Sequence, residues 1–400
     1  MNNSRQLYFD TLPYHPQPLH LETLTSYISR IATGNFIANV SQVAKLLMPD
    51  YHERNVRNLS DFTPPRVEVI ASATARTSSE IRALTFHHLV QNLGRASGSQ
   101  PQSKFLSGSV DTYLRYCPIC LEERGYRSLL WRFSDLQVCK EHQVALLDQC
   151  PHCMERIPLF PNTLDMFCCP NCGGNLSHIE CEYTAPDELA YSTELSELLE
   201  LLLVPSELQS AGLSQQLAMN IGSRLQRIRK VIGITRDDIR KHAGVMPYHS
   251  LGIENADPER GALFHEYLAY ADYLNERMLE QYPSISLMLD HETGAGLLCR
   301  VVEDALCDTN NLYNQIATTV ERVKRQTNKY RESVLLQGVF DASIDIYEED
   351  KAVSQRAVAR YLNISRRKLR GCDGAVDLVN MINRGELTDA QEFLDSHLNL

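Results

Sequence analysis

Four closely spaced pairs of cysteine and histidine residues lie near the middle of this sequence. The pairs are Cys117 and Cys120, Cys139 and His142, Cys150 and Cys153, and Cys169 and Cys172. Two intervening residues let one tight turn direct both side chains of a pair at a single ion. Two such turns supply the four ligands of tetrahedral Zn²⁺. The spacing therefore predicts two zinc ions, one held by the first two pairs and one by the last two.

The number of ligands indicates what these sites could do. Each set offers four protein ligands, whereas a catalytic zinc keeps one position open for water, so both sites are expected to be structural. Nine of the twelve cysteines lie between Cys117 and Cys181, and such clustering in a reduced cytosolic chain favours metal over disulfides. Cys168 could replace Cys169 as a ligand. Cys181 and His152 are expected to pack in the interior or to face solvent.

Helical patterns flank the cysteine-rich block on both sides. The apolar stripe of one N-terminal helix is formed by Leu24, Tyr27, Ile28 and Ile31. Residues 111–183 lack such periodicity, and the alternation in Leu129–Phe133 predicts a short strand that packs Trp131 on the first zinc module. The fold class is therefore predicted to be mainly α, with zinc-ribbon-like modules that contain short strands.

These patterns divide the chain into four expected domains. Residues 1–110 form an N-terminal helical region, and residues 111–183 form the tandem zinc modules. Residues 184–290 form a helical domain with a first helix-turn-helix. Residues 291–400 form a C-terminal helical domain with a second helix-turn-helix-like unit.

The first helix-turn-helix candidate lies within residues 224–274 and resembles the Xre/Cro-like type. Thr235 is the expected N-cap, Gly244 the turn, and Pro247 the first residue of the next helix. In that family the helix after the turn enters the major groove, which implies that Tyr248 and His249 face bases. The departures from the family pattern are Arg236, Arg240, Met246, Ser250 and Gly252. A fold used for protein contacts is an equally good reading.

The second candidate spans residues 354–369. Ser354 and Ser365 are the expected caps of its two helices, and Asn363 suits a left-handed turn between them. Three cations, Arg366, Arg367 and Lys368, crowd the start of the second helix. Helix N-termini and arginines both favour phosphate, so these residues are candidate nucleic-acid contacts. The alternative is a helical bundle with a basic, solvated face.

Overall charge and composition limit the functional classes. The formal net charge of −11 argues against a protein that wraps nucleic acid over its whole surface. The chain has no apolar run of membrane-spanning length and a polar N-terminus, so a bacterial cytoplasmic location without membrane contact is expected. An acidic cluster, Asp341, Asp345, Glu348, Glu349 and Asp350, is expected to be a solvated loop. The pair His87–His88 lacks a matching ligand pair, so no enzymatic activity is expected.

The order of these features resembles the TniQ/TnsD family of transposon targeting proteins. The resemblance rests on the following residues: Cys117-Pro118-Ile119-Cys120-Leu121, Gly125, Leu130-Trp131, Cys139 with His142, Leu146-Leu147, and Cys150 with Cys153. The segment Glu22–Ala32 is similar to the opening helix of that family. The resemblance covers residues 12–175. Beyond them lies a helical C-terminal half with helix-turn-helix units, and the total length is typical of members tied to CRISPR-guided transposons.

Membership would imply a role in targeting rather than a reaction. Such proteins link target selection to an AAA+ ATPase regulator of the TnsC class, which brings the transposase. Some dock as homodimers on an RNA-guided Cascade complex, and this type is the expected one here. Others read an attachment site in target DNA themselves, as TnsD does. A zinc-containing helix-turn-helix transcription regulator is a further alternative.

Overall fold

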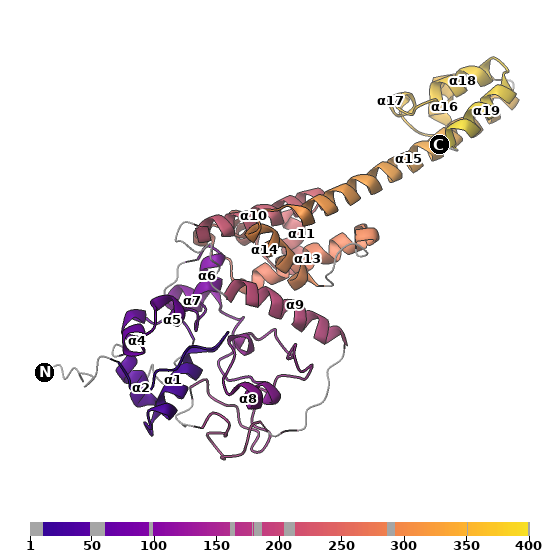
Figure 1. The fold of residues 1–400 in the computed structure, drawn as a ribbon. Helices are drawn as coiled ribbons and strands as arrows, with labels where there is room; N and C mark the ends of the chain where they lie inside the picture. Colours follow the sequence, from indigo (N-terminus) through magenta and orange to yellow (C-terminus); the bar gives the residue numbers. More distant parts are fainter. Residues whose placement is uncertain are drawn as a thin grey trace. The chain divides into compact units, whose positions relative to one another are not determined.

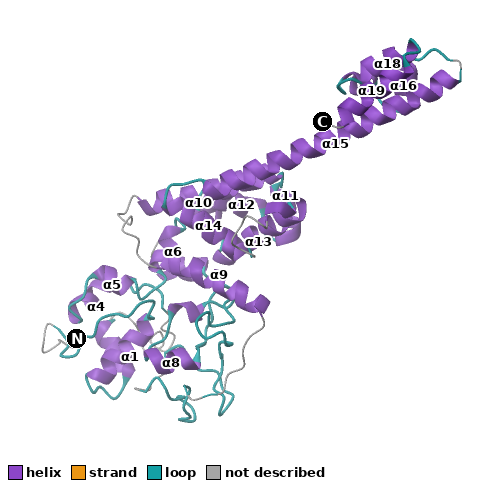
Figure 2. Ribbon diagram, turned by 45° about the vertical axis from the view of Figure 1, so that its right-hand side comes forward, coloured by secondary structure: helices purple, strands orange, loops and turns teal. Residues whose placement is uncertain are grey.

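The computed structural model describes most of the chain and confirms the predicted mainly α fold (Figures 1 and 2). The described ranges are 11–48, 61–95, 99–160, 165–177, 179, 186–203, 213–285, 293–349 and 351–398. The chain forms two compact units, residues 1–317 and residues 318–400. The finer division into four domains stays a prediction. Cys181 and Asp350 lie outside the described residues.

Short helices make up the N-terminal part of the first unit. They are α1 (Leu24–Gly34), α2 (Val40–Leu47), α4 (Val67–Ala73), α5 (Ser78–Arg82), α6 (His87–Asn92) and α7 (Ser99–Phe105). The predicted stripe of α1 is fully buried in the core that α1, α2 and α4 share. Thr23 caps α1 by accepting from the Ser26 amide at 3.1 Å.

The cysteine-rich block contains the short helix α8 (Pro118–Arg124) and the 3-10 turn η1 (Leu129–Arg132). Its backbone pairing consists of isolated bridges, and no strand occurs in the described part of the chain. The strand predicted at Leu129–Phe133 is therefore wrong. Ser128 caps the 3-10 turn through the amide of Leu130, and both Trp131 and Arg132 are buried rather than alternating between core and solvent.

A buried ion pair joins the N-terminal helices to this block. Arg132 and Asp61 pair with exposed side-chain fractions of 2% and 0%. Asp61 also accepts a hydrogen bond from the amide of Thr25 in α1 at 3.0 Å. The bridge between Glu22 and Ser128 adds a second connection. The helical region and the first zinc module are therefore packed as one body.

The rest of the first unit is a helical assembly. Its elements are α9 (Pro186–Leu203), α10 (Leu213–Ile232), α11 (Arg236–Ala243), α12 (Pro247–Glu254), η2 (Pro258–Arg260), α13 (Phe264–Gln281), η3 (Pro283–Ile285) and α14 (Gly294–Leu306). Helix α14 packs along both α9 and α13. No helix among the described residues is long and apolar enough to span a bilayer.

Glu254 connects four of these helices through its fully buried carboxylate. The side chains of Gln226 and Arg229 in α10 donate to it at 2.9 and 2.7 Å, and Tyr270 of α13 donates at 2.7 Å. Arg236 of α11 completes the set. Burial alone would raise the pKa of Glu254, but these hydrogen bonds outweigh burial and lower the pKa to about 2.

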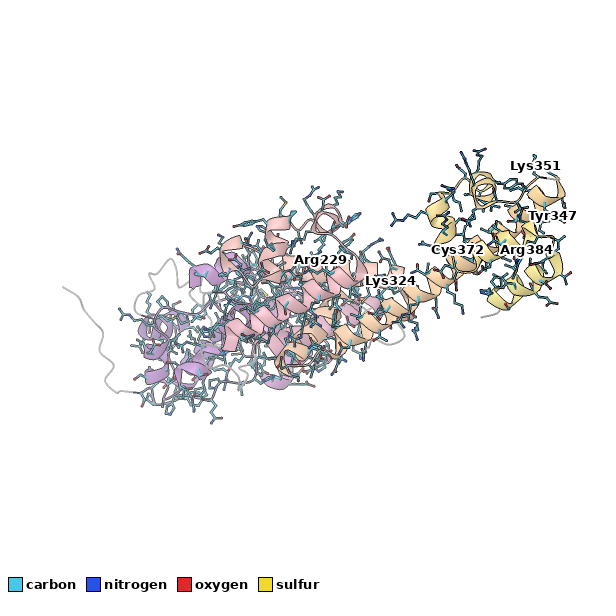
Figure 3. All side chains as sticks on the ribbon, turned by 90° about the horizontal axis from the view of Figure 1, so that it is seen from above. Arg229, Lys324, Tyr347, Lys351, Cys372 and Arg384 are labelled. Atoms are coloured by element: carbon cyan, nitrogen blue, oxygen red, sulfur yellow. The ribbon has the colours of Figure 1, made fainter. Side chains whose placement is uncertain are left out.

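The second unit is a small helical bundle. It contains the C-terminal part of α15 (Asn311–Glu348) with α16 (Gln355–Tyr361), α17 (Arg366–Arg370), α18 (Ala375–Asn383) and α19 (Leu387–Leu398). Its core is apolar and includes Cys372, which is labelled in Figure 3. The loop expected for the acidic cluster is wrong for Asp341 to Glu348, because these residues continue α15. Hydrogen bonds from Gln337 to Asp341 and from Tyr361 to Asp345 stabilise this end.

We predict that Glu254→Gln lowers the free energy of unfolding by about 3 kcal/mol at neutral pH, because it leaves two arginines facing an uncharged partner. The folded pKa lies below the ordinary value, so this stabilisation is complete above about pH 4.5 and is lost as pH falls toward 2. Denaturant unfolding across this pH range measures both effects.

The matched control is Glu259→Gln, which changes an exposed carboxylate near Glu254 in sequence. It should shift stability by less than about 0.5 kcal/mol. If the difference in unfolding free energy between wild type and Glu254→Gln stays constant from pH 7 to pH 2.5, the lowered pKa of Glu254 is contradicted.

Candidate metal centres

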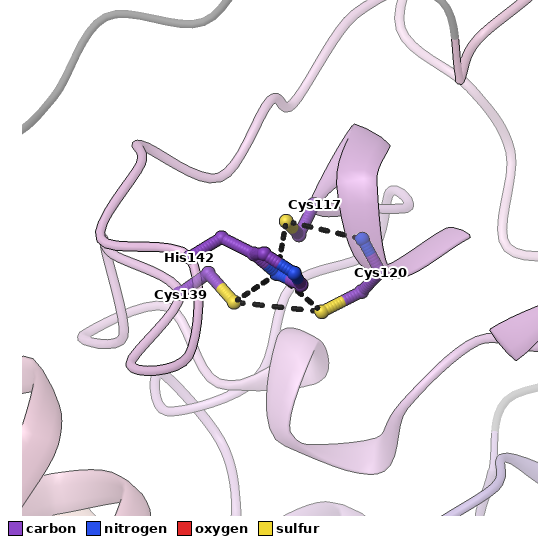
Figure 4. A group of neighbouring side chains, drawn as sticks. All are labelled: Cys117, Cys120, Cys139 and His142. Carbon is purple, nitrogen blue, oxygen red and sulfur yellow. Dashed lines mark hydrogen bonds between the residues drawn. The ribbon is translucent and has the colours of Figure 1, made fainter. Parts of the chain in front are cut away.

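The first ligand set comes together as the sequence predicts. Cys117, Cys120, Cys139 and His142 each direct one ligand atom into a group whose atoms all lie within 4.8 Å of one another (Figure 4). Cys120 Sγ lies 3.5 Å from Cys139 Sγ and 3.1 Å from His142 Nδ1. Four ligands about 2.3 Å from one ion would be separated by about 3.8 Å, so the group has the dimensions of a tetrahedral zinc shell.

Local backbone geometry positions these four side chains. Cys117 is the N-cap of α8, and its Sγ accepts from the Cys120 amide at 3.5 Å while Pro118 begins the helix. Cys139 and His142 lie in a tight turn that the bridge between Val138 and Ala145 closes. The amide of Gln143 donates to the carbonyl of Cys139 at 2.8 Å within that turn.

Glu123 orients the histidine of this set. His142 presents Nδ1 to the sulfurs, and its Nε2 lies 3.0 Å from Glu123 Oε2. A carboxylate on the far ring nitrogen fixes the ring and makes a metal-ligating histidine more basic. The sequence analysis missed Glu123, although it lies on α8 three residues after Cys120 and so on the same helix face.

The second ligand set is also assembled. The sulfurs of Cys150 and Cys172 lie 3.8 Å apart, as do those of Cys153 and Cys169, and all four lie within 4.8 Å of one another. Backbone amides donate to two of these sulfurs, from His152 to Cys150 and from Gly174 to Cys172, each at 3.4 Å. Such hydrogen bonds favour the thiolate form that binds metal.

Three of the four ligand pairs share one turn architecture. Bridges between Gln149 and Arg156 and between Cys168 and Asn175 flank the two turns of the second set, as Val138 and Ala145 flank the turn of Cys139. This arrangement separates Cys168 from its neighbour. Its sulfur donates to Asp165 at 3.2 Å, and the assembled group includes Cys169 instead.

The crowded sulfurs of the first set shift one another's pKa in opposite directions. Hydrogen bonds with Cys117 and Cys120 lower the pKa of Cys139 to about 2, whereas hydrogen bonds with Cys117 and Cys139 raise the pKa of Cys120. Several thiolates in one small volume repel one another, and a divalent cation removes that cost. Because all four positions of each set are filled by protein atoms, the residues fit closed zinc shells, which hold a fold together.

Residues 13–146 match the TniQ family. The chain therefore carries a TniQ domain. No curated protein matches it. The matched range contains α1 to α8 and the whole first ligand set, and it ends before Cys150. The protein is thus associated with transposition, and the ion pair between Asp61 and Arg132 lies wholly inside the TniQ domain.

The first candidate nucleic-acid segment has the predicted caps. Thr235 forms a capping box with Asp238, Gly244 is left-handed with φ of 72°, and Pro247 begins α12. Tyr248 is exposed. The Arg260 guanidinium lies over its ring, with Arg260 Cζ 4.7 Å from the ring centre. His249 Nδ1 lies 2.7 Å from Glu266 Oε1 of α13, so this ring is already engaged within the protein. A base-reading role for either residue stays a prediction.

The second candidate segment also has the predicted local geometry. Ser354 and Ser365 accept from the amides of Ala357 and Lys368, each at 3.2 Å, and Asn363 is left-handed with φ of 52°. The three candidate contacts, Arg366, Arg367 and Lys368, are exposed on α17. Their part in nucleic-acid binding stays a prediction.

We predict that the purified protein contains two zinc ions and that Cys120→Ser and Cys153→Ser each reduce the content to about one, because each removes a ligand from a different set. Either change should also lower the thermal midpoint, since ligation contributes directly to folding. Elemental analysis together with thermal unfolding measures both.

Cys168→Ser is the matched control for the second set. It should leave the zinc content and the midpoint unchanged, because its sulfur is bonded to Asp165 outside the group. Loss of an ion in this variant would show that Cys168 is the ligand.

Proposed function

We propose that this TniQ protein is a non-enzymatic adaptor for targeted DNA transposition. It links an RNA-guided Cascade complex, which selects the target, to an AAA+ regulator of the TnsC class and so to the transposase. The observation that carries this proposal is the TniQ match over residues 13–146. We further propose that it acts as a homodimer in the bacterial cytoplasm.

The metal-ligating groups support an adaptor over an enzyme. Among the described residues, the groups that could hold a metal are the two Cys/His sets, and each has four protein ligands. In the acidic cluster, Asp345 accepts from Tyr361 and Glu349 pairs with Lys351. His87 is buried, and that burial lowers its pKa to about 4. These features favour a scaffold that binds partners.

A TnsD-like protein that reads an attachment site is the second candidate function. It is supported by the exposed cations of α17, for which no carboxylate lies within ion-pair distance in the described chain. The same residues would serve a helix-turn-helix transcription regulator. Direct and sequence-specific binding to duplex DNA by the protein alone distinguishes these alternatives from Cascade docking.

The test of the adaptor role is assembly from purified components. The tagged protein should retain both the AAA+ regulator, with ATP present, and Cascade loaded with its guide RNA. Neither complex should require target DNA. Failure to retain either one at low salt would refute the adaptor role, and retention of the regulator with tight attachment-site binding would favour the TnsD-like alternative.

We predict that the triple variant Arg366→Ala, Arg367→Ala, Lys368→Ala weakens binding to the nucleic-acid-bearing target selector at least tenfold. Loss of three phosphate contacts should also reduce the slope of log affinity against log salt by about 2 to 3. Fluorescence titration against guide-loaded Cascade and against target duplex, at several salt concentrations, measures both quantities.

The matched control removes two other exposed cations of the same unit, Lys351 and Arg384, both labelled in Figure 3. Each already pairs with a carboxylate, Glu349 or Glu386. Their replacement by alanine should leave the salt slope unchanged. Equal losses in both variants would mean that net charge, and not α17, determines binding.

A further inference from the structure

Helix α1 ends in a turn that places Phe36 in a left-handed conformation. The Phe36 amide donates to the carbonyl of Thr33 at 3.1 Å, and the Ile37 amide donates to the carbonyl of Ala32 at 3.0 Å. These two bonds define a Schellman turn with Phe36 at its left-handed position, where φ is 53°. Glycine is usual there, because a Cβ atom strains this backbone conformation.

Other helices end in the same turn with smaller residues. Gly94 occupies the left-handed position after α6, and Ala75 occupies it after α4 with φ of 50°. Ala256 does so after α12. Asp308 after α14 and Asn363 after α16 are also left-handed, with φ of 51° and 52°. Phe36 is thus larger and more apolar than the residues at these other helix ends.

Packing within the protein does not account for the aromatic ring. The Phe36 side chain is 93% exposed, whereas its neighbour Ile37 packs against the N-terminal core. The turn thus holds the core contact through Ile37 and directs Phe36 to solvent. Strain without an internal gain is the pattern expected of a residue kept for contact with another molecule.

The sequence segment around Phe36 is uncharged, and an aromatic residue is bound to its turn. Residues 31–44 contain no Asp, Glu, Lys or Arg. Tyr14, which is 45% exposed, is bound to the same turn: its amide donates to the Asn35 side chain at 2.9 Å, and the Asn35 amide group donates back to its carbonyl at 2.7 Å. This chemistry does not suit phosphate, which requires cations, and it does suit an apolar protein surface.

We infer that Phe36 is an anchor residue that inserts into an uncharged, apolar pocket of the AAA+ regulator. The choice of partner rests on the proposed function. It is supported by the position of the turn inside the TniQ-matched range, the part of the chain that associates this protein with the transposition machinery. An aromatic side chain buried in a partner's pocket is the usual centre of binding energy at an interface.

The test compares three variants in thermal unfolding and in binding to the purified AAA+ regulator with ATP. Phe36→Gly relieves the backbone strain, so it should raise the thermal midpoint by a few degrees while weakening binding at least tenfold. Phe36→Ala keeps the left-handed strain and should weaken binding similarly with little change in the midpoint. Ala75→Gly relieves the same strain after α4 and should raise the midpoint with unchanged binding.

Opposite changes in stability and affinity are the outcome that a merely structural role for Phe36 does not produce. Unchanged affinity of Phe36→Gly, with the wild-type protein binding the regulator, overturns the anchor and leaves the adaptor role intact. If the wild-type protein does not bind the regulator, both fail. A lower midpoint for Phe36→Gly overturns the strain argument, because the ring would then be stabilising the fold.

Discussion

The buried ion pair between Asp61 and Arg132 is the interaction on which the TniQ domain depends. Isolated charges are costly to bury. Each member of this pair makes further contacts besides the ion pair itself. Asp61 also accepts from the Thr25 amide in α1, and Arg132 donates to the Asp111 carbonyl at 2.8 Å and lies over the Phe86 ring. The pair therefore ties α1 and α6 to the segment between the two ligand pairs of the first metal set.

This arrangement explains why a single family match covers a helical region and a metal module. Arg132 lies in the eighteen-residue segment that separates Cys120 from Cys139. Metal ligation would fix both ends of that segment, and the ion pair would fix its middle against the helices. The second ligand set lies beyond residue 146, and its segment contacts the helices differently: Phe160, between Cys153 and Cys169, packs into the core of α1, α2 and α4.

Sequence reasoning succeeded where a local pattern carries the structure. The ligand pairs, the stripe of α1, and the caps at Thr235, Ser354 and Ser365 all depend on residues a few positions apart. Sequence reasoning failed where contacts between residues far apart in the sequence determine the local structure. The 3-10 turn at Leu129–Arg132 replaces a strand because Arg132 reaches Asp61, 71 residues away. No local sequence pattern predicted the buried network of Glu254 either, because its four partners come from three other helices, α10, α11 and α13.

The two candidate recognition segments differ in what nucleic-acid contact would cost them. His249 is bonded to Glu266, so a base contact by its Nδ1 atom would break a hydrogen bond between α12 and α13. Arg366, Arg367 and Lys368 are exposed, and within the described chain no carboxylate competes for them. Contact with phosphate would cost them only hydration and side-chain entropy. For a chain of net charge −11, a local cationic site of this kind is the more economical way to meet a polyanion.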